Sequence, residues 1–280
     1  FYLLPDSDDY DNMPQDPLNP LTGAKVEVGK LIYHDPAFAT EGIALRAKTW
    51  SCASCHHARA GFKSGMIQGI GEGGEGFGLK GETRGWFDPE IGTQDADVQP
   101  VTSPTILNVA FQDVMLWNGQ LGNASNGIIN VGIDPEILMT EGTPKVANAE
   151  GLSGIETQAI AGTGVHRILG FPPELEDSDY YQMLLDAFPE YSRDELHKSS
   201  TRAIAAFERT VLANQSPFQL WLRGNTDAMS EREIAGAEVF FGDGGCVACH
   251  QGAAFSSPIG ATADQVFFAV GFADLDFNEV

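Results

Sequence analysis

The cysteines constrain this chain most strongly, because all four fall into two copies of one five-residue pattern. The copies are Cys52-Ala53-Ser54-Cys55-His56, the first motif, and Cys246-Val247-Ala248-Cys249-His250, the second motif. Two thiols three positions apart can each bond to one edge of a flat macrocycle, and the following His can then reach a metal at its centre. C-x-x-C-H is the attachment signature of c-type haem. The sequence therefore predicts two covalently attached haems, with His56 and His250 as proximal iron ligands.

Two other interpretations of the paired cysteines are weaker. A structural zinc site takes its ligands from nearby pairs, whereas these pairs lie near opposite ends of the chain, and each precedes a His that a four-cysteine site would not need. Thioredoxin-like redox pairs follow a strand in a βαβ pattern, and no such pattern precedes either motif. Because no thiol is left over, structural disulfides are not expected.

Charge and composition limit the partners. The 280 residues include 16 Lys and Arg against 39 Asp and Glu, a net charge of −23, and 42% are hydrophobic, enough to bury a core. Nucleic acid and anionic membrane surfaces would be repelled, which favours a cationic partner or a neutral small substrate. No apolar stretch is long enough to span a bilayer, and no basic and apolar leader is recognisable. The chain begins at Phe1, which suggests a processed or shortened protein. Covalent haem then predicts a periplasmic or other extracytoplasmic location.

The pattern along the chain predicts a mainly α fold with long loops and few or no strands. Residues 1–20 are acidic and rich in Pro and Asn, which is typical of an extended arm or tether. Ser192-x-x-Glu195 and Ser230-x-x-Glu233 are capping boxes that predict helix starts. The predicted helices are Val26–Tyr33, Pro104–Trp117, Gly154–Leu169, Asp179–Phe188, Ser192 to about Asn214, and Ser230–Phe241. Two cytochrome c-like lobes are expected, each organised around one haem.

With these residues in place, the chain resembles the bacterial di-haem cytochrome c peroxidases and their MauG-like relatives from about residue 24 onward. The matching segments are Val28–Pro36, Trp50–His57, Ser103–Asn108, Trp117–Gly119, Ala203–Thr210, Ser216–Phe218 and Gly245–His250. The ordered set with these flanks is much more specific than C-x-x-C-H alone.

The resemblance implies two domains with different functions. Residues 21–213 would hold a peroxidatic haem, and residues 214–280 an electron-transfer haem whose domain is incomplete at its C-terminus. Trp117 matches a Trp that lies between the haems. The implied activity is reduction of hydrogen peroxide to water, with electrons from a small cytochrome c or cupredoxin; a homodimer is compatible with the sequence. Two alternatives stay open: a MauG-like oxidase that acts on residues of a partner protein, and a di-haem electron-transfer subunit without peroxidase activity.

The loop after the first motif departs from the family pattern. Ile70-Gly71-Glu72-Gly73 carries Glu72 where relatives that need reductive activation carry a displaceable His. A carboxylate is a weaker haem ligand than imidazole, so the first iron is expected to be open or water-bound without activation.

The residues expected to transfer protons to bound peroxide also differ from the family pattern. Peroxide cleavage needs a group that moves a proton between the two oxygens. Gln158 matches the family's distal Gln, but the position expected for its Glu falls near Ile168, which cannot transfer protons. His166 lies close by and is predicted to take that role, with Glu72 and Glu156 as rival bases.

Two further ligands of the family are missing from their expected places. No Met or Tyr follows His250 to serve as the second haem's sixth ligand. Thr102 stands where a family calcium site uses Asn, which weakens the case for calcium.

Overall fold

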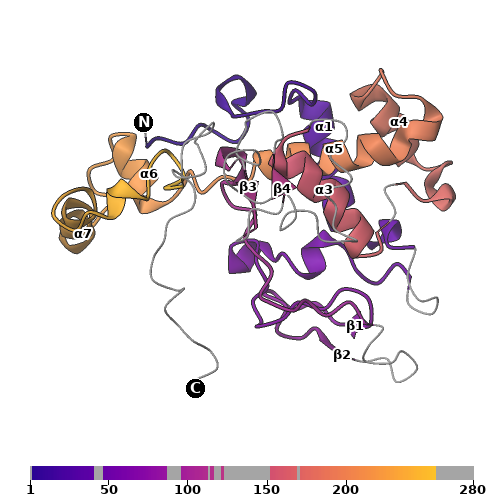
Figure 1. Ribbon diagram of the computed structural model, residues 1–280, viewed down its shortest axis with the longest axis horizontal. Coiled ribbons are helices and arrows are strands. Elements are labelled where there is room, and N and C mark those ends of the chain that lie inside the picture. Colours follow the sequence, from indigo (N-terminus) through magenta and orange to yellow (C-terminus); the bar gives the residue numbers. More distant parts are fainter. Residues whose placement is uncertain are drawn as a thin grey trace, which may run out of the picture.

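The computed structural model describes residues 2–40, 47–86, 96–112, 114–116, 121–122, 152–168 and 171–256. Within these ranges the chain is mainly helical, as the sequence predicts (Figure 1). The helices are α1 (Gly23–His34), α3 (Gly154–Val165), α4 (Asp179–Ala187), α5 (Leu196–Arg209), α6 (Pro217–Leu222) and α7 (Glu231–Phe241). The two-residue strands β1 (Gly74–Glu75) and β2 (Gly85–Trp86) pair antiparallel, as do β3 (Val114–Met115) and β4 (Leu121–Gly122). None of the described helices has the length and apolar character required to cross a membrane.

The core is built where α1 and α3 pack on α5. At the crossing of α1 and α5, a Cβ on Gly29 would lie 1.8 Å from the carbonyl oxygen of Ala203, so only glycine permits this close approach. The two helices therefore meet backbone to backbone. The buried apolar side chains around the crossing are Val28, Ile32 and Tyr33 of α1, Ile155 and Ala159 of α3, and Ile204 and Phe207 of α5.

The helix starts confirm the predicted capping. At α7, the Ser230 N–H donates to Glu233 Oε2 at 2.7 Å, and the Glu233 N–H donates back to Ser230 Oγ at 3.3 Å. At the other box, the Ser192 N–H donates to Glu195 Oε2 at 3.3 Å, and a 3₁₀ turn at Arg193–Glu195 leads directly into α5. These contacts satisfy N–H groups that have no partner within the helix.

The predicted helix at Pro104–Trp117 is wrong. Its described part forms a 3₁₀ turn at Val109–Phe111 followed by β3. Asn108 adopts a left-handed φ of 60°, which ends any right-handed helix. Asn108 is held there because its N–H donates to Val211 O and its Oδ1 accepts from the Ala213 N–H, both at 2.8 Å. Contacts with the end of α5 therefore override the local apolar pattern.

The acidic N-terminal segment lies on the body of the protein. Leu4 and Met13 are buried, and the Leu4 N–H donates to Gln219 Oε1 at 2.8 Å. Further along, Asn19 Nδ2 donates to Arg202 O at 3.0 Å. The segment thus runs across α5 and α6, because its few apolar side chains and its backbone groups find partners there.

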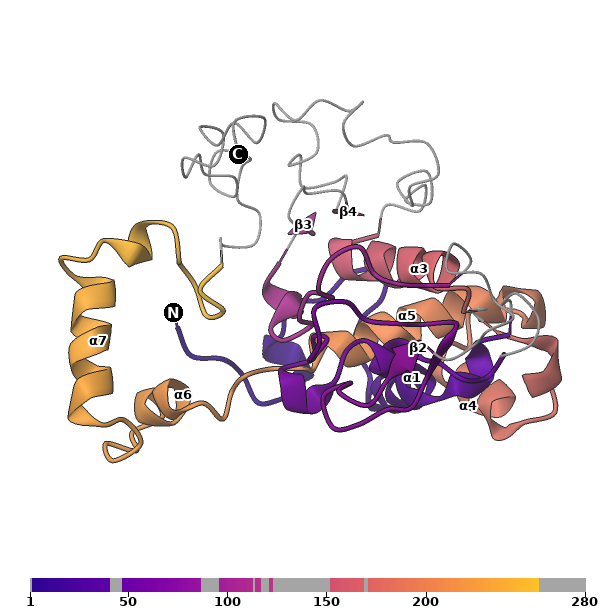
Figure 2. The ribbon, with the colours of Figure 1, turned by 90° about the horizontal axis from the view of Figure 1, so that it is seen from below.

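Figure 2 shows α6 and α7 at the end of the molecule remote from α4. Residues 210–216 connect α5 to α6, and within α7 itself no residue is buried. The second motif follows α7 at this end.

Candidate functional site

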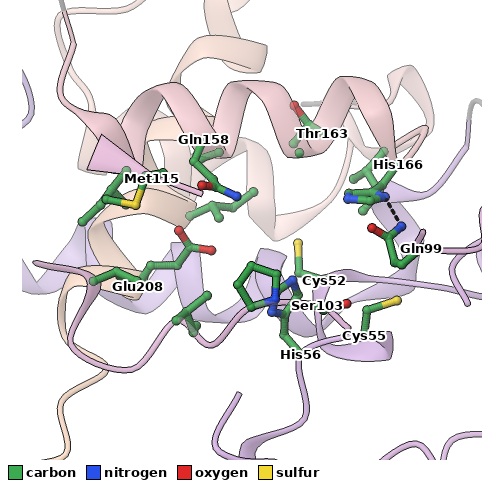
Figure 3. A pocket seen from close by; sticks show the side chains of 18 of the residues that line it. Cys52, Cys55, His56, Gln99, Ser103, Met115, Gln158, Thr163, His166 and Glu208 are labelled. Carbon is green, nitrogen blue, oxygen red and sulfur yellow. Dashed lines mark hydrogen bonds between the residues drawn. The ribbon is translucent and has the colours of Figure 1, made fainter. Parts of the chain in front are cut away.

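A cavity opens between the first motif and α3 (Figure 3). It contains about 960 Å³ of space free of protein atoms, part of it open to solvent. Its floor carries Cys52, Cys55 and His56, and the opposite wall is the α3 face that carries Gln158 and ends at His166.

The first motif folds as a 3₁₀ turn at Cys52–Ser54 that presents His56 to the cavity. The His56 N–H donates to Cys52 O at 3.0 Å, and its ring Nδ1 lies 3.0 Å from the carbonyl oxygen of Phe62. Because a carbonyl can only accept, Nδ1 carries the proton, which leaves Nε2 with a free lone pair. Burial lowers the pKa of His56, so the imidazole is neutral near pH 7. A neutral imidazole oriented through Nδ1 is the form that binds a metal.

The two thiols of the first motif are uncharged. Burial raises the pKa of Cys52 to about 12 and that of Cys55 to about 12. A zinc site would need both as thiolates. A thioether sulfur carries no charge, so covalent attachment of a porphyrin suits this wall better than binding of a bare metal ion.

The second motif repeats this local geometry. It forms a 3₁₀ turn at Cys246–Ala248, the His250 N–H donates to Cys246 O at 3.0 Å, and His250 Nδ1 lies 3.1 Å from Phe255 O. Phe62 and Phe255, which supply the accepting carbonyls, both have left-handed φ angles, of 56° and 55°. The two Phe residues follow the His of their motif at unequal spacing, six positions after His56 and five after His250, so this structural repeat was not predicted.

The surroundings of the second motif differ from those of the first. Cys246, Cys249 and His250 are exposed among the described residues. The ring of Phe240 lies 6.2 Å from that of His250, and rings at 5.0–6.4 Å from one another continue the cluster. The members of this cluster are Tyr2, Phe218, Trp221, Phe240, Phe241 and Phe255.

His166 lies on the cavity wall at the end of α3. Its Nδ1 is 2.9 Å from Asp97 Oδ2 and 3.2 Å from Gln99 Nε2, and its side chain is 29% exposed. Trp50 Nε1 donates to the His166 carbonyl at 2.8 Å and so fixes the backbone. The predicted pair Gln158 and His166 therefore lies in one cavity with the first motif.

Other predicted residues lie elsewhere. Glu72 is fully buried but is not on the cavity wall, because its carboxylate pairs with Arg167. Glu156 is also turned away from the cavity, towards Arg209. The geometry gives no support to either carboxylate as the base in the pocket. Trp117 lies outside the described residues, so its role between two haems stays a prediction.

Two acidic residues on the cavity wall were missed. Asp97 sits in a loop with no motif that would have revealed it. The position of Glu208 could have been predicted from the sequence. It follows Ile204 by four residues and therefore shares the buried face of α5. A carboxylate within a buried apolar stripe is rare unless it is paired or functional.

The cavity fits a haem by its own chemistry. Apolar side chains such as Ile106, Val109 and Ile155 line much of it, as a porphyrin ring requires. The Ser103 hydroxyl on the wall is buried without a hydrogen-bond partner among the described residues, which leaves a donor for a polar ligand group. Cys52, Cys55 and His56 are the residues that could hold such a ring and its metal.

Comparison with known proteins decides the family. The family model described as "Di-haem cytochrome c peroxidase" matches residues 23–227. The chain belongs to the di-haem cytochrome c peroxidase family. Haem is the cofactor of that family, and the family resemblance deduced from the sequence is confirmed.

The sequence identity to individual relatives is low. Cytochrome c peroxidase Ccp of Escherichia coli (strain K12) is 26% identical over 91% of this chain and 44% of its own length. Methylamine utilization protein MauG of Methylorubrum extorquens is 23% identical over 86% of this chain and 53% of its own length. The chain thus spans about half the length of these curated relatives. A crystal structure of a MauG-like protein associated with microbial copper homeostasis shares the fold, with a TM-score of 0.52, 20% identity, and coverage of 93% of this chain and 60% of that one.

Proposed function

We propose that this protein is a c-type di-haem peroxidase that reduces hydrogen peroxide to water. The observation that carries the proposal is the cavity that combines the first motif with Gln158 and His166. A haem held there by Cys52, Cys55 and His56 would supply an iron that binds and reduces peroxide. The second covalent haem would be held by Cys246, Cys249 and His250.

The residues of the cavity then have distinct tasks. His56, oriented by the Phe62 carbonyl, would hold the iron of a bound haem. The Gln158 amide orients a bound peroxide by hydrogen bonds. His166, held by Asp97 and partly exposed, exchanges protons with solvent at the rim. Calcium is the weakest of the proposed cofactors, because the Thr102 hydroxyl already donates to Ile67 O at 2.7 Å.

Electrons would enter through a separate C-terminal domain at residues 214–280, and residues 21–213 would form the peroxidatic domain. The position of α6 and α7 at one end of the molecule supports this division. A net charge of −23 favours a small cytochrome c or cupredoxin with a basic docking face, and it predicts that salt slows turnover. Covalent haem attachment implies a periplasmic or other extracytoplasmic location.

Peroxide turnover tests this function directly. The full-length protein with both haems is expected to oxidise two equivalents of a reduced small cytochrome c for each peroxide consumed, as two-electron reduction requires. Optical spectra recorded with limiting peroxide give the ratio. Reversible reduction of both haems without any response to peroxide would contradict the proposal and indicate an electron-transfer subunit.

A MauG-like oxidase is the second candidate, and the similarity to MauG favours it. Such an enzyme would store two oxidising equivalents after one equivalent of peroxide. In the absence of a donor, a long-lived oxidised spectrum that decays on addition of a protein substrate would favour this candidate over a peroxidase.

Replacing His166 with Gln is expected to slow the reaction with peroxide about 100-fold, because Gln keeps a hydrogen bond but cannot exchange a proton. Stopped-flow measurement of the haem absorbance gives the rate. His197→Gln, at an exposed position of α5, is the matched control and should react at the wild-type rate. Equal rates for the two variants would remove His166 from the mechanism.

A further inference from the structure

The cavity holds a carboxyl group that the proposed mechanism does not use. Glu208 lies in the last turn of α5, is 9% exposed, and reaches the cavity wall beside Gln158 (Figure 3). Its side chain forms no hydrogen bond or ion pair with any residue that the structure describes. A buried carboxyl without a partner is costly to keep ionised, and such groups concentrate at functional sites.

The neighbouring cation does not neutralise Glu208. Arg209 directs Nε to Glu156 Oε1 at 3.0 Å and Nη2 to Glu156 Oε2 at 2.6 Å, so its guanidinium is already paired. The other titratable groups close enough to act on Glu208 are Tyr33 of α1 and Cys52 of the first motif. Both are neutral near pH 7, because burial raises the pKa of each.

The surroundings therefore keep a proton on Glu208. Burial raises its pKa to about 8, the charge of Glu156 acts in the same direction, and Arg209 opposes them only in part. Near pH 7 the group is a neutral carboxylic acid inside the cavity. An acid with a pKa close to the working pH transfers protons efficiently.

We propose that Glu208 is the proton-donating acid of the first cavity and acts beside the Gln158 amide. The proposal rests on the proposed peroxidase function. Ile168 lies near the position expected for such an acid and lines the cavity, but its aliphatic side chain cannot donate a proton. Glu208 supplies the missing carboxyl from a different helix, which is why the spacing along the chain does not reveal it.

The proton and electron balance of peroxide reduction defines the role of Glu208. Hydrogen peroxide, two protons and two electrons give two water molecules. The O–O bond breaks, the proton of Glu208 moves to the departing oxygen, and that oxygen leaves as water. Both electrons come from the donor protein, the second proton comes from solvent, and the Glu208 carboxylate then regains a proton from solvent.

Infrared spectroscopy of the full-length protein with both haems tests the proton site. Between about pH 6 and about pH 10, wild-type protein is expected to lose the C=O band of a protonated carboxylic acid, with a midpoint near pH 8. Glu208→Gln should lack that band, and Glu208→Asp should retain a shifted one. Glu27→Gln, at an exposed position of α1, is the matched control and should retain the wild-type band. Visible spectra establish that each variant carries both haems.

Stopped-flow mixing with peroxide tests the donation. The wild-type rate of haem oxidation should fall as the pH rises through about 8, because the acid is then deprotonated. Glu208→Gln should react about 100-fold more slowly near pH 7 and lose this pH dependence.

Two results would overturn the proposal: a titrating band that persists in Glu208→Gln, or a wild-type rate in that variant. If instead wild-type protein does not react with peroxide while the band titrates and disappears in Glu208→Gln, Glu208 stands as the cavity's proton site, and the peroxidase function is what fails.

Discussion

A variant with alanine at both Cys52 and Cys55 is expected to carry one covalent haem instead of two and to lose much of its thermal stability. The two thiols on the cavity floor are the proposed attachment points, and no other cysteine lies on the cavity wall. The intact mass of the denatured polypeptide counts the covalent haems. Thermal unfolding followed by far-ultraviolet circular dichroism measures the stability.

The expected loss of stability follows from the apolar lining of the cavity. Without a haem, side chains such as Ile106, Val109 and Ile155 lose the apolar surface of the ring that would pack against them. We expect Tm to fall by roughly 10 °C or more, since each kcal/mol shifts Tm of a domain this size by a few degrees.

The second motif provides the matched control. Alanine at both Cys246 and Cys249 should also remove one covalent haem. The drop in Tm should be smaller, because these thiols are exposed and no residue within α7 is buried. Two haems on the Cys52/Cys55 variant would contradict the covalent attachment, and equal losses of Tm in the two variants would contradict the assignment of the buried cavity to the first haem.

Local signals in the sequence predicted much of this fold. The capping boxes at Ser192 and Ser230 fixed the starts of two helical segments, since the contacts that define them span only three residues. The segment from Pro104 failed for the opposite reason. Its apolar spacing suits a helix, but Asn108 is held in a left-handed conformation by Val211 and Ala213, about a hundred residues away in the chain.

The candidate site likewise combines features set by local sequence with features set by long-range packing. The motifs predict the attachment residues, because two thiols and an imidazole at fixed spacing suit one chemistry. Spacing does not show whether a loop side chain faces a cavity. Glu72 was interpreted as a pocket base, yet it turns to Arg167 behind the cavity wall. Glu208 reaches the cavity from α5, and only the packing of α5 against α3 brings it near Gln158.

Replacing Arg209 with Met is expected to lower the free energy of unfolding by about 3–5 kcal/mol, because it leaves the Glu156 carboxylate buried without a cation. The side chains of this pair are 4% and 0% exposed, and Arg209 Nη1 also donates to Pro14 O at 3.0 Å. The pair thus joins α3, α5 and the N-terminal segment. Urea unfolding of the holoprotein measures the change.

Two controls isolate the buried pair. Arg193→Met removes a cation from an exposed pair with Glu176, whose side chains are 56% and 44% exposed, and should lower the free energy of unfolding far less than Arg209→Met does. Glu156→Gln combined with Arg209→Met removes the unpaired charge, so the double variant should be more stable than Arg209→Met alone. Similar losses for Arg193→Met and Arg209→Met would contradict the expected role of burial.

The pH dependence of stability should reverse in Arg209→Met. In wild-type protein, burial acts to raise the pKa of Glu156, but Arg209 and hydrogen bonds from Ser153 and Asn19 outweigh it and hold the pKa below its usual value. The carboxylate therefore contributes stability above the unfolded-state pKa near 4.5, and this contribution is lost as the pH falls through the lower folded-state pKa. Without Arg209, burial dominates and the folded-state pKa rises above the unfolded one. The Glu156 contribution to the unfolding free energy should then decrease as the pH rises above about 4.5. Unfolding curves over this range for both proteins, compared with the double variant, measure that contribution, and an unchanged slope would show that Arg209 does not set the charge of Glu156.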